Sequence, residues 1–322
     1  MRIFVSGSIA RDLIMDFPGR FADYIDLKKI HVLNLSFGVK DLKQNLGGTA
    51  ANIAYNLALL GERPEILGAV GGDGREILKS YSRLGIGVNH VKISKRFQTA
   101  AAFIMTDRDD NQITGFYKGA LAEPLHLPKV KQGDLAIVAS SANPGEMTRA
   151  ARHYQRHKVF YIFDPGLAIT SLSAEQMRVG VRGAAILIGN DYEISFIASS
   201  LRGRKAEANS SVGGLLLRQM ADRKDTILVR TLGPKGSEIY ASGKKIRIGI
   251  ARPRRVLDPT GAGDAYRAGL IKGFREGLDL KRACQLGATV AAFAVENYGA
   301  QNHKFNYGII INRHNRNFKE KI

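Results

Sequence analysis

Short apolar runs that alternate with helix-like segments are the feature that most constrains the fold of this chain. Runs of this length are typical of buried strands and too short for buried helices. Strands that alternate with helices predict a mainly parallel sheet, covered on both faces and joined by right-handed crossovers. The strand-like runs are 3–6, 135–139, 159–163, 185–188 and 227–229, and the helix-like segments are 145–157, 173–181 and 212–221.

Two segments interrupt this alternation. The first is about 13–46, and the second is 99–119, where two strand-like runs flank an Asp109-Asp110-Asn111 turn. Polar turn residues between such runs predict a β-hairpin. A surface hairpin without a role in function is the alternative to a functional one.

The segment 258–266 combines a phosphate cradle with a carboxylate. Gly261, Ala262 and Gly263 bring backbone N–H groups to the start of a predicted helix, where the helix dipole favours an anion. Asp264 falls in the first turn and can accept a proton from an attacking hydroxyl. This pattern predicts phosphoryl transfer, with Asp264 as base and 261–263 as anion hole. The alternative is a Gly-rich helix start whose acidic residue complements the dipole.

A second glycine-rich turn precedes a helix that we expect to stop at Gly61. Gly47 and Gly48 permit close backbone approach to a ligand, and Thr49 is the expected N-cap. Asn52 lies about one turn further on, with an amide that can donate to and accept from hydroxyl groups. A capped helix without a ligand explains the same pattern. The turn follows the first strand-like run, as ligand sites do in α/β sheets.

Composition is compatible with a soluble α/β domain. The chain has 322 residues, 44% of them hydrophobic, enough to bury a large core. One cysteine, Cys284, excludes an intramolecular disulfide and is expected to pack in the core. We find neither a signal peptide nor an apolar run that could span a membrane, and therefore expect a cytoplasmic protein.

The net charge of +19 is the unusual property of the composition. Such a charge can steer anionic ATP or attract nucleic acid. A solvated basic surface is the favoured interpretation, because the clusters are scattered and lack interleaved aromatic residues that would stack on bases. The basic clusters are 202–205, 244–247 and 252–255.

Taken together, the motifs resemble those of the PfkB (ribokinase-like) family of carbohydrate and nucleoside kinases, over nearly the whole chain. The segments 47–52 and 258–266 match the two family signatures in order and spacing. Segment 189–193 resembles the family's N-x-x-E element near metal and phosphates, and 231–236 its nucleotide-site T-x-G-x-x-G. Segment 295–301 resembles the loop behind the adenine site.

The resemblance implies one ribokinase-like domain over 1–322, a three-layer αβα fold with a mainly parallel sheet. It also implies a small β-strand lid over the substrate, formed by about 13–46 and 99–119. ATP with Mg²⁺ is expected as co-substrate, with Glu193 holding Mg²⁺ through water. The nucleotide residues implied are Asn190, Thr231, Gly233 and Gly236, and the acceptor residues are Asp12, Gly47, Gly48, Asn52, Gln112 and Phe116.

Within the family, the chain is most similar to archaeal-type nucleoside and adenosine kinases. The similarity lies in 106–114, 163–166 and 264–269. After Asp164 the chain lacks the arginine of the D-x-N-x-R run found in many sugar kinases, and the Gly-Gly turn lacks a lysine for a phosphosugar. The resemblance therefore implies phosphorylation of a nucleoside 5′-hydroxyl. A sugar kinase acting on a free sugar is the alternative, and a kinase-like nucleic-acid-binding protein is a more remote one.

Two further expectations come from the resemblance. Asp258 and Thr260 stand where some relatives bind a monovalent cation, so K⁺ is a candidate ligand; the alternative is that Asp258 and Pro259 only shape the turn. The lid strands offer free edges, so a homodimer through them is expected. Nucleic acid and membranes are not expected as partners.

Overall fold

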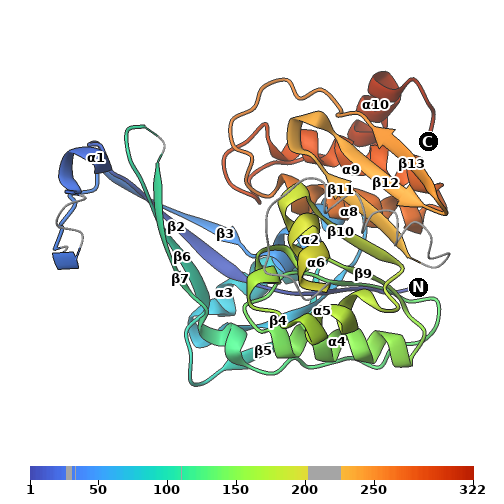
Figure 1. Ribbon diagram of the computed structural model, residues 1–322, viewed down its shortest axis with the longest axis horizontal. Coiled ribbons are helices and arrows are strands. Elements are labelled where there is room, and N and C mark those ends of the chain that lie inside the picture. Colours follow the sequence, from blue (N-terminus) through green and yellow to red (C-terminus); the bar gives the residue numbers. More distant parts are fainter. Residues whose placement is uncertain (27–30, 33, 110, 202–225) are drawn as a thin grey trace.

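The computed structural model describes residues 1–26, 31–32, 34–109, 111–201 and 226–322. Its centre is a nine-stranded sheet in the order β13-β12-β11-β10-β9-β8-β1-β4-β5 (Figure 1). The strands from β11 to β5 run parallel, and β12 and β13 are antiparallel additions at one edge. The strands are β1 (Ile3–Ser6), β4 (Glu65–Gly71), β5 (Gly87–Ser94), β8 (Leu135–Val138), β9 (Phe160–Phe163), β10 (Ile186–Asn190), β11 (Ile227–Thr231), β12 (Ser237–Ala241) and β13 (Lys244–Ile248).

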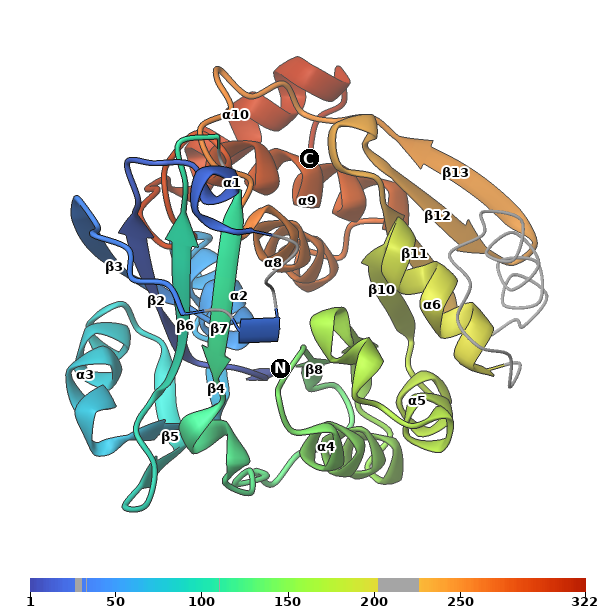
Figure 2. The ribbon, with the colours of Figure 1, turned by 60° about the vertical axis from the view of Figure 1, so that its left-hand side comes forward.

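Helices cover both faces of this sheet, which confirms the predicted three-layer arrangement (Figure 2). Successive residues of a strand point to opposite faces. Ile3 and Val5 accordingly pack among α2, α3, α8, α9 and α10, whereas Phe4 packs against α4, α5 and α6. The helices are α2 (Thr49–Leu59), α3 (Arg75–Arg83), α4 (Pro144–Arg156), α5 (Ala174–Val181), α6 (Asp191–Leu201), α8 (Ala262–Arg275), α9 (Leu280–Ala294) and α10 (Tyr307–Phe318).

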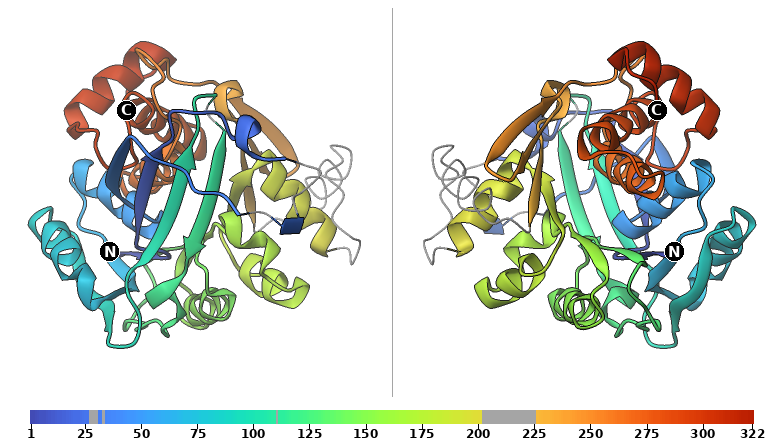
Figure 3. Two further views of the ribbon diagram at one scale, coloured as in Figure 1. Left: turned by 90° about the vertical axis from the view of Figure 1, so that its left-hand side faces the viewer. Right: turned by 90° about the vertical axis from the view of Figure 1, so that its right-hand side faces the viewer.

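A second, four-stranded sheet in the order β3-β2-β6-β7 projects from the main body (Figures 1 and 3). We call it the small sheet. Its two inner strands run parallel, and each outer strand is antiparallel to its neighbour. The predicted hairpin is confirmed as β6 and β7. The strands of the small sheet are β2 (Ala10–Asp16), β3 (Asp41–Gly47), β6 (Ala100–Thr106) and β7 (Gln112–Tyr117).

An aromatic cluster lies where β2 ends at the far end of the small sheet. Phe17 stacks on Phe21 of α1 (Phe21–Tyr24) and meets Phe37 edge-on, with ring centroids 4.7 Å apart. The buried carboxylate of Asp107 accepts the N–H of Phe21 at 2.9 Å. The segment between β2 and β3 is thereby fastened to the β6–β7 turn.

Several details differ from the sequence-based expectations. The strands β4 and β5, the antiparallel pair β12 and β13, and helices α3 and α10 were not anticipated. The expected helix at 212–221 and the basic cluster at 202–205 lie outside the described residues. Cys284 is fully buried, as expected of a packing residue. None of the helices in the described ranges has the length and hydropathy to cross a membrane.

Candidate active site

The predicted site residues gather where the parallel strands end. This carboxyl edge is where α/β sheets bind ligands, because the helix starts that follow the strands point there. The chain leaves β1 at this edge and continues into β2 of the small sheet, and β6 rises from the same side after β5. The edge of the large sheet and the small sheet therefore flank one region (Figure 2).

The start of α2 explains the paired glycines. Gly48 has a φ of 94°, and a Cβ there would lie 2.6 Å from the carbonyl oxygen of Ser8. Only glycine fits this position. The expectation that Thr49 is the N-cap was wrong: Gly48 occupies the cap position, and the Oγ of Ser8 accepts the N–H of Thr49 at 2.9 Å. A serine distant in sequence replaces the local cap because Gly48 has no side chain.

The start of α8 has the geometry of an anion hole. Gly261 adopts a φ of 77°, and Ala262 is the first helical residue. The N–H of Ala262 reaches the Pro259 carbonyl at 3.2 Å, whereas helix geometry leaves the N–H groups of Gly263 and Asp264 without an acceptor in the helix. Gly263 is exposed. These donors and the helix dipole favour an anion at this point.

Asp264 and Asn52 meet although they belong to different helices. Asn52 Nδ2 donates to Asp264 Oδ2 at 2.8 Å. Burial raises the pKa of Asp264 to about 7, against the opposing effects of Arg267 and of the Asn52 hydrogen bond. A carboxylate with a pKa near neutrality is suited to accept a proton at neutral pH. The structure therefore brings the two glycine-rich segments into contact.

A buried ion pair, which no sequence motif predicts, lies beneath the anion hole. Arg267 of α8 binds both carboxylate oxygens of Asp164, which follows β9, with Nη2 2.6 Å from Oδ1. Its Nη1 donates to the carbonyl of Gly263 at 3.0 Å. Both residues are almost completely buried. The guanidinium thus fixes the backbone of the anion hole from below.

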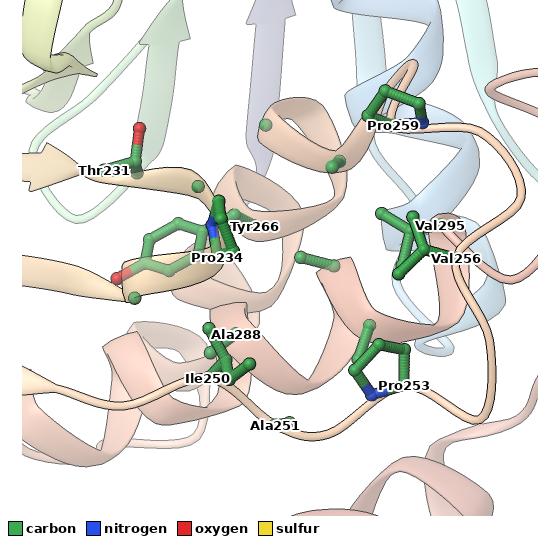
Figure 4. A pocket seen from close by; sticks show the side chains of 16 residues that line it. Thr231, Pro234, Ile250, Ala251, Pro253, Val256, Pro259, Tyr266, Ala288 and Val295 are labelled. Carbon is green, nitrogen blue, oxygen red and sulfur yellow. The ribbon is translucent and has the colours of Figure 1, made fainter.

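A cavity of about 370 Å³ adjoins the anion hole (Figure 4). Thr231, Gly233 and Gly236, three of the predicted nucleotide residues, line it together with Ala262 and Gly263 of the anion hole. The fourth, Asn190, is exposed and is not among the lining residues. Most of the remaining lining is apolar. Pro234, Pro259, Tyr266 and Val295 belong to the predicted motif segments, whereas the other lining residues were not predicted: Ile250, Ala251, Pro253, Val256, Ala288, Ala291 and Ala292.

Three alanines of α9 make room for this cavity. Ala288, Ala291 and Ala292 share one helix face with Val295, at spacings of three and four residues. Val295 begins the segment 295–301, which resembles the family's loop behind the adenine site, and it lines the cavity. The spacing of the alanines could have indicated that this face of α9 lines a cavity, but small residues at helical spacing are equally typical of close helix packing.

Asn190 and Glu193 cap the start of α6. Asn190 Oδ1 accepts the N–H of Glu193, and Glu193 Oε2 accepts the N–H of Asn190, both at 2.8 Å. Burial, with Asp164 nearby, raises the pKa of Glu193. The described residues contain no cluster of three or more His, Cys, Asp or Glu that could hold a metal. A single carboxylate still fits Mg²⁺, which is commonly bound by one or two carboxylates, water and substrate phosphates.

The small sheet carries the remaining predicted acceptor residues. Asp12, Asn45 and Phe116 share one face, because Asp12 pairs with Asn45 and Ala102, which in turn pairs with Phe116. We call this the inner face. Asn302 Nδ2 donates to Asn45 Oδ1 at 3.2 Å, so the inner face meets the loop after α9. Burial, and then Asp258, raise the pKa of Asp12.

Gly47 lies next to Asp12, whereas Gln112 lies further along the small sheet. A Cβ at Gly47 would lie 2.4 Å from Asp12 Oδ2, so the glycine leaves space for that carboxylate. Gln112 shares the inner face but pairs with Thr106, which pairs with Asp16. That row lies four residues, or roughly 13 Å, from the row of Asp12. The structure does not bring Gln112 close to Asp12.

Asp258 is held in the turn that precedes α8. Its Oδ1 accepts the N–H of Thr260 and its Oδ2 accepts the N–H of Gly299, each at 2.8 Å. These bonds tie the turn to the loop after α9. The turn-shaping alternative thus accounts for both oxygens, and the cation site stays a prediction.

Comparison with known proteins agrees with this geometry. The pfkB family carbohydrate kinase model matches residues 19–305. The chain belongs to the pfkB family.

Members similar to this pfkB kinase include nucleoside kinases. The chain is 33% identical to the nucleoside kinase of Methanothermobacter thermautotrophicus over 94% of this chain and 95% of that protein. The nucleoside kinase of Burkholderia thailandensis in complex with inosine is a solved structure with 30% identity, a TM-score of 0.80 and 99% coverage of both chains. The Methanocaldococcus jannaschii nucleoside kinase structure has 26% identity and a TM-score of 0.82, covering 98% of this chain and 99% of that one.

One basic cluster of this pfkB kinase is partly neutralised. On β13, Lys245 and Arg247 both bind the buried carboxylate of Glu238, which also binds Arg230. Burial opposes ionisation of Glu238, but the bonds from Lys245, Tyr240 and Arg230 outweigh it and lower its pKa to about 2. This arrangement favours the structural interpretation of the 244–247 cluster.

Proposed function

We propose that this pfkB kinase transfers the γ-phosphoryl group of ATP to the 5′-hydroxyl of a nucleoside. The observation that carries the proposal is the Asn52–Asp264 pair, set at the mouth of the anion hole and beside the apolar cavity. Similarity to proteins named nucleoside kinases supports a nucleoside over a free sugar as acceptor. The nucleoside kinase of Burkholderia thailandensis, a similar structure, has also been solved in complex with ADP-inosine.

The cavity suits the base and ribose of ATP. Apolar walls with few polar groups are typical of sites that bury a base. From there the phosphates reach the N-terminus of α8, because Ala262 and Gly263 line the same cavity. The N–H groups of Gly263 and Asp264 stabilise the negative charge that develops during transfer.

The acceptor lies between the inner face of the small sheet and the starts of α2 and α8. The Asp12 carboxylate accepts from a ribose hydroxyl, and the Asn52 amide donates to one. Gly47 and Gly48 allow the ribose to approach the backbone. Phe116, 53% exposed on the inner face, provides a surface on which a base can stack. Gln112 contributes only if the small sheet bends toward the site.

Asp264 acts as the general base. It takes the 5′-hydroxyl proton as that oxygen attacks the γ-phosphorus, the bond to the β-phosphate oxygen breaks, and ADP leaves. Because the pKa of Asp264 is raised to about 7, the ionised base is substantially populated at neutral pH and binds its proton strongly enough to assist.

Two cations complete the proposal. Glu193 would help to hold Mg²⁺ through water, and Mg²⁺ would neutralise charge on the ATP phosphates. K⁺ would bind near Asp258 and Thr260 through backbone carbonyls. Replacing K⁺ by a large organic cation is expected to lower turnover, and unchanged turnover would remove K⁺ from the account.

The chain acts as one domain over 1–322, with the small sheet as a lid formed by about 13–46 and 99–119. Closure of a lid excludes water and so protects ATP from hydrolysis. Location in the cytoplasm stays a prediction. Shortening the β6–β7 turn should raise ATP hydrolysis without acceptor relative to transfer.

The outer face of the small sheet supports a homodimer. Leu42, Met15, Met105 and Ile113 form one row across the four strands, and Leu42 and Ile113 are 61% and 48% exposed. An apolar row of this kind favours pairing with a second copy. Light scattering of Leu42→Glu/Ile113→Glu should show monomers, and Thr114→Glu, from the inner face, should leave the dimer intact.

A panel of acceptors tests the function. Adenosine, guanosine, inosine, cytidine, ribose and fructose are each incubated with Mg-ATP, and the phosphorylated product is identified by mass. A nucleoside monophosphate supports the proposal. Product from free sugars alone would favour the sugar kinase. No product, together with salt-dependent DNA binding that survives Asp264→Asn, would favour the nucleic-acid-binding alternative.

A further inference from the structure

The carboxamide of Asn52 is held from two sides. Its Nδ2 donates to Asp264 at 2.8 Å, and its Oδ1 accepts from Gln301 Nε2 at 2.8 Å. Gln301 Oε1 in turn accepts from the Tyr81 hydroxyl at 3.2 Å. These four side chains come from α3, the loop after α9, α2 and α8, so no local sequence pattern links them.

The hydrogen bonds that link these four side chains all run in one direction, with Tyr81 donating to Gln301, Gln301 to Asn52 and Asn52 to Asp264. If both amides were reversed, Asn52 Oδ1 would face Asp264 and could bind it only in its protonated form. Reversal would also remove the acceptor of the Tyr81 hydroxyl. Tyr81 is 1% exposed, and Gln301 is the acceptor that the described residues offer it. Leaving a buried hydroxyl proton without an acceptor is costly, so Tyr81 opposes the reversal.

Tyr81 is a donor over the whole working pH range. Burial raises the pKa of Tyr81 to about 12. Around Asp264 itself, the charged groups are Arg267 of its own helix, Asp164 after β9 and Glu193 of α6. The amides of Gln301 and Asn52 add no charge near Asp264. They favour its ionised form because they point an N–H donor at its carboxylate.

We propose that Gln301, held by Tyr81, is a positioning residue for phosphoryl transfer: it orients Asn52 so that Nδ2 faces Asp264 Oδ2. Oδ1 of Asp264, which accepts no hydrogen bond from the described residues, then stays open to the acceptor hydroxyl. The second hydrogen of Asn52 Nδ2 is still available to the acceptor. The inference rests on the proposed role of Asp264 as base.

Gln301→Met tests this directly, because methionine is similar in size and neutral but cannot donate to Asn52. The kcat/KM of this variant should fall about tenfold below pH 7 and approach the original value near pH 9, since a lost hydrogen bond to the carboxylate raises its pKa. Tyr81→Phe should shift the profile in the same direction by less. An unshifted profile, or an equal loss at every pH, would overturn the proposal.

A control and a second readout separate this inference from the proposed function. Gln155 lies on α4, on the opposite face of the sheet, and donates to Tyr161, Val179 and Arg182. Gln155→Met removes these bonds and should leave the profile unshifted. NMR of ¹³C-labelled aspartate, with Asp264→Asn to assign the signal, gives the pKa of Asp264 without turnover. Gln301→Met should raise that pKa even if no acceptor is found, and an unchanged pKa would refute the inference alone.

Discussion

Asn52 Nδ2 and Asp264 Oδ2 lie 2.8 Å apart and join two helix starts that are 212 residues apart in the sequence. One of these starts is shaped for close approach of an acceptor, and the other for an anion. Their contact places the proposed base between the two proposed ligand sites. Phosphoryl transfer requires this arrangement, because the protein acts mainly by positioning and electrostatics.

Asp264→Asn should lower kcat by at least about 100-fold, since the amide cannot accept the hydroxyl proton. Mg-ATP binding should change little, because the donors of the anion hole are backbone groups. Titration calorimetry with ATP and steady-state kinetics on the same preparation check both statements. A folded variant with near-original turnover would exclude Asp264 as the base.

Stability should depend on pH through Asp264. Its pKa is about 7 in the folded protein and ordinary in the unfolded chain, so the folded state binds the proton more tightly. The resulting stabilisation is complete below pH 4 and is lost as the pH rises to about 7. Asp264→Asn should therefore raise Tm relative to the original chain at pH 8 but not at pH 4. Equal differences at both values would contradict the raised pKa.

Breaking the buried pair of Arg267 and Asp164 should be strongly destabilising. Asp164→Asn leaves the guanidinium buried without its counter-charge, and such losses cost about 3–5 kcal/mol. Urea unfolding measures the loss. The double variant Asp164→Asn/Arg267→Met should recover part of it, because neither partner of this pair is left as a charge without its counter-ion. Additive losses would show that the two residues act independently.

Ala291→Phe should fill part of the nucleotide cavity. Because the cavity lies on the α9 side and the acceptor on the side of the small sheet, KM for ATP should rise at least about tenfold while KM for the nucleoside changes little. Steady-state kinetics with each substrate varied in turn give both constants. A rise confined to the nucleoside KM would place ATP elsewhere.

Much of this architecture could be predicted from the sequence, because strands and helix starts have local signals. Gly48 and Gly261 indicate turns with positive φ, and the place of Asp264 in the first helical turn indicates its position beside the anion hole. Three contacts could not be predicted. They are the hydrogen bond from the Thr49 N–H to Ser8, the Arg267–Asp164 ion pair and the Gln301–Asn52 hydrogen bond. Each joins segments distant in sequence, and each residue type alone fits many other roles.

The central claim is tested most directly by ³¹P NMR and mass analysis of the product formed from inosine or adenosine with Mg-ATP. The account predicts a nucleoside 5′-monophosphate and ADP in equal amounts, with formation at least about 100-fold slower in Asp264→Asn. Absence of the monophosphate with a folded enzyme, or its formation at an equal rate in Asp264→Asn, would contradict the account.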